Sequence, residues 1–289
     1  MLPRRSITGI FRESYFEWSA KDAPRLGAAL AYYTMFSLAP LLVVVIAVAG
    51  MFFGADSTRQ QVVWHVQELV GREGGQAVQA LLKSTQEPAR GLGPALLGLI
   101  TLIFGASLVV AELRNALNTI WEVAPPKDPG GILKQIWDLV KRRLFSFMLV
   151  VGIGFLLLIS LLANAALAAV GKYFDAELPL PEAALQSLNF VLSCVVSTAI
   201  FAAIYKALPD LRIAWSEVIV GAAVTSVLFN TGKLAISLYL GKSSLGSAYG
   251  AAGSLAVLLA WVYYSAQIFF FGAVFTHVYS KRIARTNRS

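Results

Sequence analysis

Long stretches without a charged side chain alternate with short polar loops along most of this chain. Four stretches contain no Asp, Glu, Lys or Arg at all, namely residues 26–55, 91–111, 144–171 and 183–205. Crossing a hydrocarbon core of about 30 Å takes roughly 20 apolar residues in an α-helix. Each stretch is therefore long enough to cross a bilayer, and the pattern predicts that lipid is the solvent of this chain.

Two further stretches extend the pattern. Residues 214–240 are uncharged from Val218 to Gly232, with Lys233 beyond, and residues 243–280 form the longest uncharged run. That last run would reach about 57 Å as one helix, which is too long for a single crossing, so we expect a non-helical or re-entrant lead-in before its helix. The predicted spans are residues 26–54, 92–112, 144–170, 183–205, 214–240 and 254–279. The fold class is thus an all-α integral membrane protein, a bundle of six transmembrane helices in one membrane domain.

The basic residues predict the orientation of this bundle. Lys and Arg are frequent in the N-terminal tail, in the loop 113–143 and in the C-terminal tail, and they are sparser in the loops that alternate with these. Basic loops stay on the cytoplasmic side of a membrane. We therefore expect both termini in the cytoplasm, and an inner-membrane, multi-pass location.

The two larger loops have their own patterns. In the noncytoplasmic loop, residues 56–90, apolar residues recur at helical spacing on either side of Gly74-Gly75, which predicts two amphipathic helices that cap the bundle or lie at the bilayer surface. In the cytoplasmic loop, a helix is expected to continue past Asn118 and Trp121 until Pro125-Pro126 breaks it.

Composition agrees with a membrane protein. The 289 residues are 57% hydrophobic and 14% charged, and the mean hydropathy is +0.67. The net charge of +8 is explained by basic residues at cytoplasmic headgroups, so nucleic acid is not an expected partner. The first apolar stretch exceeds a signal-peptide core and is expected to remain as a helix. Cys194 is the single cysteine, which excludes an intramolecular disulfide.

No motif of enzymatic chemistry stands out. The two histidines, His65 and His277, lie in no metal-ligand spacing, and neither a nucleophile elbow nor a phosphate-binding glycine loop is present. We expect no enzyme activity, no metal and no cofactor. Membrane lipids, an anionic lipid substrate and further copies of the chain are the partners that remain.

Pro40 lies deep in the first predicted span. Its ring and its missing N–H should free the carbonyl of Phe36 and kink the helix, and such freed polarity must face protein or water. The functional interpretation is a substrate-lining hinge beside Tyr32, Tyr33 and Ser37. The competing interpretation is a static packing kink.

Lys233 is the clearest charge inside a predicted span, and such a residue is a functional hypothesis by default. Facing the bundle, its ammonium would suit an anion, a phosphate headgroup or an acidic partner. Alternatively it snorkels to the outer headgroups. Gly246, Gly250 and Gly253 fit close helix packing or, less simply, a re-entrant substrate loop.

Polar side chains within the spans are read as interhelical hydrogen bonds or, alternatively, as ligand contacts; they are Asn164, Asn189, Ser193, Ser197, Thr198 and Asn230. The complete set of candidate substrate-lining residues is Tyr32, Tyr33, Ser37, Pro40, Asn118, Asn230, Lys233, Tyr249, Gly250 and Gly253.

Several motifs follow one another in order along the chain, namely the segments 26–40 (LGAALAYYTMFSLAP), 116–121 (ALNTIW), 205–210 (YKALPD), Gly221, Lys233-Leu234, 249–253 (YGAAG) and 261–266 (WVYYSA). Together they resemble the YihY/BrkB family of bacterial inner-membrane proteins. The resemblance extends from about residue 12 to 279. It implies a six-helix membrane protein, for whose family lipid export and a role in virulence have been proposed.

The resemblance has two qualifications. An older family label is ribonuclease BN, but the metal-binding histidine and aspartate cluster of true ribonucleases of that name is missing here. Many members carry Glu after the pair that corresponds to Gly272-Ala273, whereas this chain has Val274. A mechanism that needs a carboxylate at that position is not supported by this residue.

Three functions are weighed on these grounds. The leading hypothesis is a nonenzymatic transporter or flippase-like protein for an amphiphilic, anionic substrate such as a lipid, since transporters place their sites at broken helices near the bilayer midplane. The alternative is a membrane scaffold or regulator that binds partners through the basic cytoplasmic loop. A membrane-associated ribonuclease is the third and rests on nomenclature only.

Overall fold

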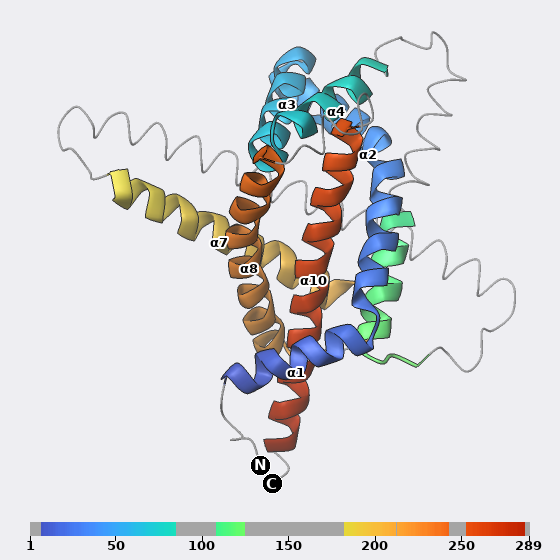
Figure 1. Ribbon diagram of the computed structural model, residues 1–289, viewed down its shortest axis with the longest axis vertical. Helices are drawn as coiled ribbons and strands as arrows, with labels where there is room; N and C mark the ends of the chain where they lie inside the picture. The colour runs from blue at the N-terminus through green and yellow to red at the C-terminus, as the bar shows by residue number, and fades with distance from the viewer. Residues whose placement is uncertain (1–6, 85–107, 125–181, 212, 243–252, 287–289) are drawn as a thin grey trace, which may run out of the picture. The chain divides into compact units, whose positions relative to one another are not determined.

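The computed structural model describes residues 7–84, 108–124, 182–211, 213–242 and 253–286, and all regular secondary structure in these residues is helical (Figure 1). The helices are α1 (Ile7–Ala20), α2 (Ala23–Phe53), α3 (Ala55–Val70), α4 (Arg72–Ser84), residues 108–120, α7 (Glu182–Ala207), α8 (Trp215–Lys242) and α10 (Gly253–Thr286). The predicted all-helical class is thus confirmed for the described part of the chain.

Helices lie over four predicted spans. α2, α7, α8 and α10 cover the first, fourth, fifth and sixth, and α2 continues as one helix through Pro40. Within the described residues, the segments Phe190–Ala207 and Gly253–Ala284 are long and apolar enough to cross a membrane. The third span, most of the second and the lead-in at 243–252 lie outside the described residues, and the kink at Pro40 stays a prediction.

The chain divides into two compact units. Unit 1 comprises residues 1–18, 117–230 and 271–289, and unit 2 comprises residues 19–116 and 231–270. The boundaries fall within α1, the helix at 108–120, α8 and α10, so each of these helices contributes one part to each unit.

An apolar cluster joins α3 and α4 to α2 and α10 in unit 2. Leu42 and Ile46 of α2 pack with Val78 and Leu82 of α4. A second cluster combines Val70 and Ala77 of the α3–α4 hairpin with Val257 and Leu258 at the start of α10. Both amphipathic helices of the predicted loop therefore exist, and burial of their apolar faces explains their position across the ends of α2 and α10 (Figure 1).

The break between these two helices differs from the prediction. It falls at Gly71, whose φ of 93° is readily accessible only to glycine, and not at Gly74-Gly75, which lie inside α4. Gly74 and Gly75 are buried, and a Cβ on either would press against Val70 or Gln67 of the preceding helix. Their role is thus close packing within the hairpin.

The helix at residues 108–120 also ends earlier than expected. Trp121 and Glu122 form a turn, and Glu122 has a φ of 57°. The Val123 N–H donates to the Asn118 carbonyl across this turn, at 2.9 Å. The helix therefore stops before the Pro125-Pro126 pair, because the turn already satisfies its last backbone groups.

A reciprocal glycine–threonine contact holds α8 and α10 together in unit 1. A Cβ on Gly221 of α8 would overlap the Thr276 hydroxyl of α10, and a Cβ on Gly272 of α10 would overlap the Thr225 hydroxyl of α8. Each threonine also donates to the carbonyl four residues earlier on its own helix, Thr225 to Gly221 at 2.7 Å and Thr276 to Gly272 at 2.8 Å. Each glycine thus leaves room for the opposite threonine, and the two helices approach closely.

Candidate functional site

Two sequence motifs meet at one end of unit 1, in a cluster that we call the motif junction (Asn118, Trp121, Tyr205, Asp210 and the Ala273 carbonyl). The Asn118 amide nitrogen donates to Asp210 Oδ2 at 2.9 Å, and its oxygen accepts the Asp210 backbone N–H at 3.0 Å. This paired arrangement fixes the orientation of the amide. It joins the helix at 108–120 to the loop between α7 and α8.

Trp121 forms the centre of the motif junction. Its side chain is 3% exposed, and Nε1–H donates to the Ala273 carbonyl of α10 at 3.2 Å. Its ring meets that of Tyr205 edge to face, with centroids 5.9 Å apart. The turn at Trp121 and Glu122 thereby binds both α7 and α10, with its polar N–H satisfied.

Tyr205 connects the motif junction to α8. The side chain is fully buried, and its hydroxyl lies 3.2 Å from Thr225 Oγ1. Since the Thr225 hydroxyl donates to Gly221, Tyr205 is the donor of this bond. A Cβ on Gly272 would approach the Tyr205 hydroxyl to 2.7 Å, so glycine is required there as well.

The next motif residue, Lys206, closes the loop between α7 and α8. Its ammonium donates to the Ile213 carbonyl and lies 5.5 Å from the centroid of the Trp215 ring. A cation over an indole face is attracted by the ring quadrupole. Tyr205 and Lys206 at the end of α7 and Asp210 in the loop that follows therefore each make a different contact.

Further along α8, three side chains form a polar ladder with α7 (Ser197, Ser226 and Asn230). The Asn230 amide donates to the Ser226 carbonyl at 2.9 Å and to the Ser197 hydroxyl at 3.2 Å. Ser226 donates to the Cys194 carbonyl at 2.7 Å. Asn230 and Ser226 are buried, so the interhelical hydrogen bonds expected for Asn230 and Ser197 are present.

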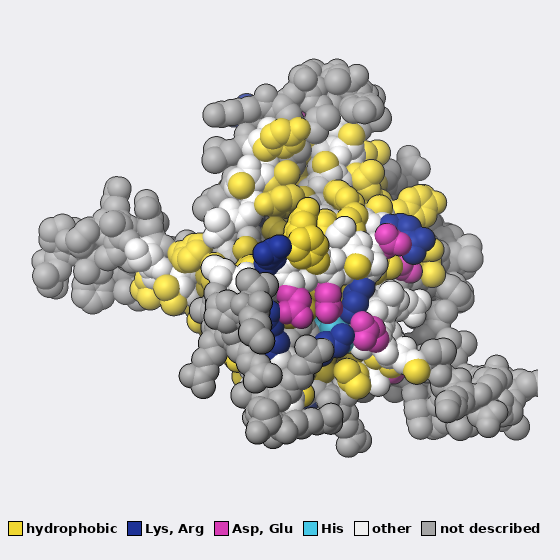
Figure 2. All heavy atoms as spheres, turned by 60° about the horizontal axis from the view of Figure 1, so that its bottom comes forward, with side chains coloured by type: hydrophobic (Ala, Val, Ile, Leu, Met, Phe, Trp, Pro, Cys, Tyr) yellow, Lys and Arg dark blue, Asp and Glu magenta, His cyan; other side chains and the backbone are white. Residues whose placement is uncertain are grey.

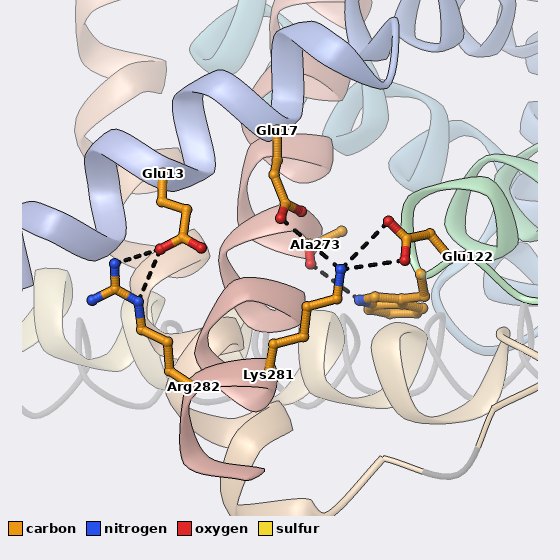
Figure 3. Close-up of polar contacts among 7 residues, drawn as sticks. Glu13, Glu17, Glu122, Ala273, Lys281 and Arg282 are labelled. Atoms are coloured by element: carbon orange, nitrogen blue, oxygen red, sulfur yellow. Dashed lines mark hydrogen bonds and ion pairs between the residues drawn. The ribbon is translucent and has the colours of Figure 1, made fainter. Parts of the chain in front are cut away.

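Ion pairs surround the end of α10, where acidic and basic side chains gather on one face (Figure 2). Lys281 Nζ lies 3.2 Å from Glu122 Oε2 and 4.0 Å from Glu17 Oε1, and Arg282 pairs with Glu13 of α1 (Figure 3). The Arg282 guanidinium also donates to the Gly9 carbonyl. These partly exposed pairs join α1 and the Trp121–Glu122 turn to α10.

The structure places the candidates of α2 in different environments. Tyr32 is 58% exposed, Tyr33 is half-buried, and their ring centroids are 5.7 Å apart. Ser37 is buried and donates to the Thr34 carbonyl of its own helix at 3.0 Å. Pro40 lies within α2, but its side chain is outside the described set.

The remaining candidate residues also lie in different surroundings. Lys233 is half-buried on α8, one turn beyond Asn230, and Gly253 is the buried first residue of α10. Tyr249 and Gly250 lie outside the described residues. Of the candidates in unit 1, Asn118 belongs to the motif junction and Asn230 to the polar ladder.

Other residues of these clusters were not among the candidate residues predicted from the sequence. Trp121, Tyr205 and Asp210 were recognised only as parts of family motifs, and Thr225, Ser226 and Thr276 were not singled out. The spacing of Gly221 to Thr225 and of Gly272 to Thr276 was a usable signal, because small residues four apart mark close helix pairs in membranes. The partner of each motif, by contrast, had no local signal.

The chemistry of these clusters is that of hydrogen bonding and ion pairing. Among the described residues, no three His, Cys, Asp or Glu side chains come together as a metal site would require. Amides and hydroxyls line the interior of unit 1, and charges lie at the end of α10. Such an interior holds helices in register and offers donors and acceptors to a polar group.

Within the described residues, the all-helical structure and the two apolar helices of spanning length are consistent with a helical membrane protein. Comparison with known proteins identifies its family: the family model "Virulence factor BrkB" matches residues 14–289, so the chain belongs to the BrkB family. The resemblance seen in the motifs is confirmed.

The curated relatives are also described as membrane proteins. The chain is 27% identical over 256 residues to a UPF0761 membrane protein of Pseudomonas aeruginosa, covering 87% of this chain and 58% of the relative. It is 28% identical over 280 residues to a UPF0761 membrane protein of Saccharophagus degradans, covering 94% and 60%. The chain thus spans about three fifths of the length of these relatives. No solved structure matches it.

Val274 directly follows the Gly272-Ala273 pair of α10. Its side chain is fully buried in α10, next to the Ala273 carbonyl that accepts the Trp121 N–H. An apolar residue is well accommodated there, since it has no polar group to satisfy.

Proposed function

We propose that this protein is a nonenzymatic inner-membrane transporter or flippase-like protein that moves an amphiphilic, anionic substrate such as a lipid. The observation that carries this proposal is the polar ladder of Ser197, Ser226 and Asn230 between α7 and α8, in which Ser226 and Asn230 are buried and Ser197 is half-buried. Polar groups in hydrocarbon are costly unless they are paired. A ladder whose members bond to one another can exchange these bonds for bonds to a substrate headgroup.

Charge supports an anionic substrate. Lys233 lies one turn beyond Asn230 on α8, and it is half-buried within an apolar stretch. A half-buried ammonium on an apolar helix favours phosphate or carboxylate groups over neutral ones. Tyr32, Tyr33, Ser37, Pro40, Tyr249, Gly250 and Gly253 complete the proposed substrate-lining set.

The proposal includes six spans with both termini in the cytoplasm. Its support is the pairing of α1 with the last turns of α10 through Glu13 and Arg282, which keeps the two described ends of the chain together. Reporter fusions at the two ends test it. Opposite locations of the two reporters would refute the topology.

Headgroup translocation in proteoliposomes tests the transport activity directly. Purified protein is expected to move fluorescent anionic lipids faster than empty vesicles do, and Lys233→Ala is expected to lower that rate about tenfold, since a buried charge-assisted hydrogen bond contributes about 1.5–3 kcal/mol. Lys83→Ala, at an exposed lysine of α4, is the matched control and should leave the rate unchanged. Transport at the empty-vesicle level for every anionic lipid tried would refute the proposal.

Purification from mild detergent separates transport from the scaffold hypothesis. A chain that purifies alone with tightly bound lipid favours transport, whereas a stoichiometric protein partner favours a scaffold. Incubation with tRNA precursors and added metal tests the ribonuclease hypothesis, and the RNA should stay intact.

A further inference from the structure

Helix α1 has two faces of different character. Its inward face packs on α10, with the Phe11 ring 6.1 Å from Phe271 and 5.1 Å from Phe275, centroid to centroid. Its outward face consists of exposed residues three and four apart, namely Thr8, Arg12, Tyr15, Phe16 and Ser19. Such spacing places them along one side of the helix.

The charges of α1 divide between the two faces. Glu13 and Glu17 point toward α10, where they meet Arg282 and Lys281 (Figure 3). Arg12 is therefore the one charged side chain on the outward face. The acidic groups of α1 neutralise the end of α10, and the face turned away from it is cationic.

Aromatic side chains dominate the rest of the outward face. Tyr15 and Phe16 are each 58% exposed, and the Arg12 guanidinium lies 5.7 Å from the centroid of the Phe16 ring. Exposed rings of this size are unfavourable in water but suited to the headgroup level of a bilayer, where aromatic and basic residues concentrate.

From these observations we infer that the outward face of α1 docks onto the anionic headgroups of a lipid surface, as an interfacial helix. The attachment of α1 to α10 agrees with this. α1 runs across α10 near its end (Figure 1), and α10 contains a segment of spanning length. A helix that crosses the end of a spanning helix lies along the membrane plane, with its outward side at the interface.

Size argues against a protein partner as the occupant. α1 has 14 residues, so it is about 21 Å long, and one face of it would bury a few hundred Å². A stable protein interface buries about 1,200–2,000 Å² in total. A continuous lipid surface needs no such area from this helix, because α10 already holds it in place.

This inference is independent of any transport activity. It predicts that α1 senses the charge of the lipid surface, and the test uses the full chain with a single label. In a Cys194→Ala background, Thr8→Cys receives a nitroxide, and the protein is placed in nanodiscs of phosphatidylcholine with or without phosphatidylglycerol. The readout is collision of the nitroxide with oxygen, which partitions into lipid, and with a nickel chelate, which stays in water.

Added phosphatidylglycerol is expected to raise oxygen collisions and to lower nickel collisions. Arg12→Gln is expected to weaken this docking equilibrium about fivefold, the contribution of one basic residue near an anionic surface. Lys83→Gln removes an exposed charge from α4 and should have no effect. Phe16→Ser should reduce oxygen collisions in both lipids.

Two results would overturn the inference. One is a nitroxide equally open to the nickel chelate in both lipids, which would show that the face stays in water. The other is protection that depends neither on phosphatidylglycerol nor on Arg12, which would show that protein covers the face. None of these variants changes Glu13, Glu17, Lys281 or Arg282, so the ion pairs of α1 with α10 should remain, and elution as the same species on size exclusion checks that each variant is folded.

Discussion

The two units hold their helices together in different ways. In unit 1, α8 and α10 meet through Gly221, Thr276, Gly272 and Thr225, with hydroxyls and backbone in close contact. In unit 2, the α3–α4 hairpin meets α2 and α10 through branched and aliphatic side chains such as Leu42 and Leu82. One contact depends on the absence of side chains, and the other on their bulk.

The difference follows from the solvent that each contact replaces. Aliphatic side chains gain little by leaving lipid for a helix interface, so helices in a membrane associate through close backbone approach and hydrogen bonds. An amphipathic hairpin is different, because burying its apolar face removes it from water. Adding atoms should therefore destabilise the contact in unit 1 most, and removing atoms should destabilise the contact in unit 2 most.

The largest effect is expected from adding atoms in unit 1. Gly272→Leu would drive a side chain into Thr225 and Tyr205, and it should destabilise the protein by about 3 kcal/mol or prevent folding. Denaturation of the purified protein in detergent measures this. Ala199→Leu, at an exposed position of α7, adds a similar volume and should have little effect.

A paired substitution sharpens this prediction. Gly221→Ala should be destabilising by about 1–3 kcal/mol, and Thr276→Ala in the same chain should restore part of the loss by removing the overlapping hydroxyl. Strictly additive losses would show that the two residues are not in contact.

Removing atoms should matter more in unit 2. Leu82→Ala deletes three carbons from the cluster with Leu42, Ile46 and Val78, and it should cost about 2–3 kcal/mol. The comparison is Leu255→Ala at an exposed position of α10. Equal losses for the two variants would contradict a water-driven origin of this cluster.

A smaller effect is expected at the motif junction. Trp121→Phe keeps an aromatic ring but removes the donor to the Ala273 carbonyl, so the expected loss is about 1 kcal/mol. Trp64→Phe, at an exposed tryptophan of α3, should be neutral. An unchanged unfolding free energy for Trp121→Phe would mean that the hydrogen bond contributes nothing to stability.

The smallest effect is expected at the ion pairs. Glu122→Gln should lower stability by about 0.5 kcal/mol or less, because Glu122 is 57% exposed and Lys281 also meets Glu17. The loss should vanish at about 1 M salt, where exposed charges are screened. A loss that persists at high salt would indicate that the pair is shielded from solvent.

The positions of α7 and α8 followed from the sequence, because apolar residues and their uncharged length are local signals, whereas α1 was not predicted as a separate helix. α7 and α8 begin and end within a few residues of their predicted spans. The position of the break in the α3–α4 hairpin could not be predicted from the sequence, because three glycines stand close together at positions 71, 74 and 75. Which of them turns the chain depends on packing of α4 against α3, where Gly74 and Gly75 are needed for close contact.

In the candidate site, too, some features could be predicted from the sequence and others could not. The sequence alone determined the helical membrane class, the helices α7 and α8 and the motifs that mark the family, because these depend on residue type and spacing along one segment. Only the tertiary structure decided that Asn118 pairs with Asp210, and that Trp121 bonds to the Ala273 carbonyl. Those partners are far apart in the chain, and hydrogen bonds between them form only when packing brings their helices together.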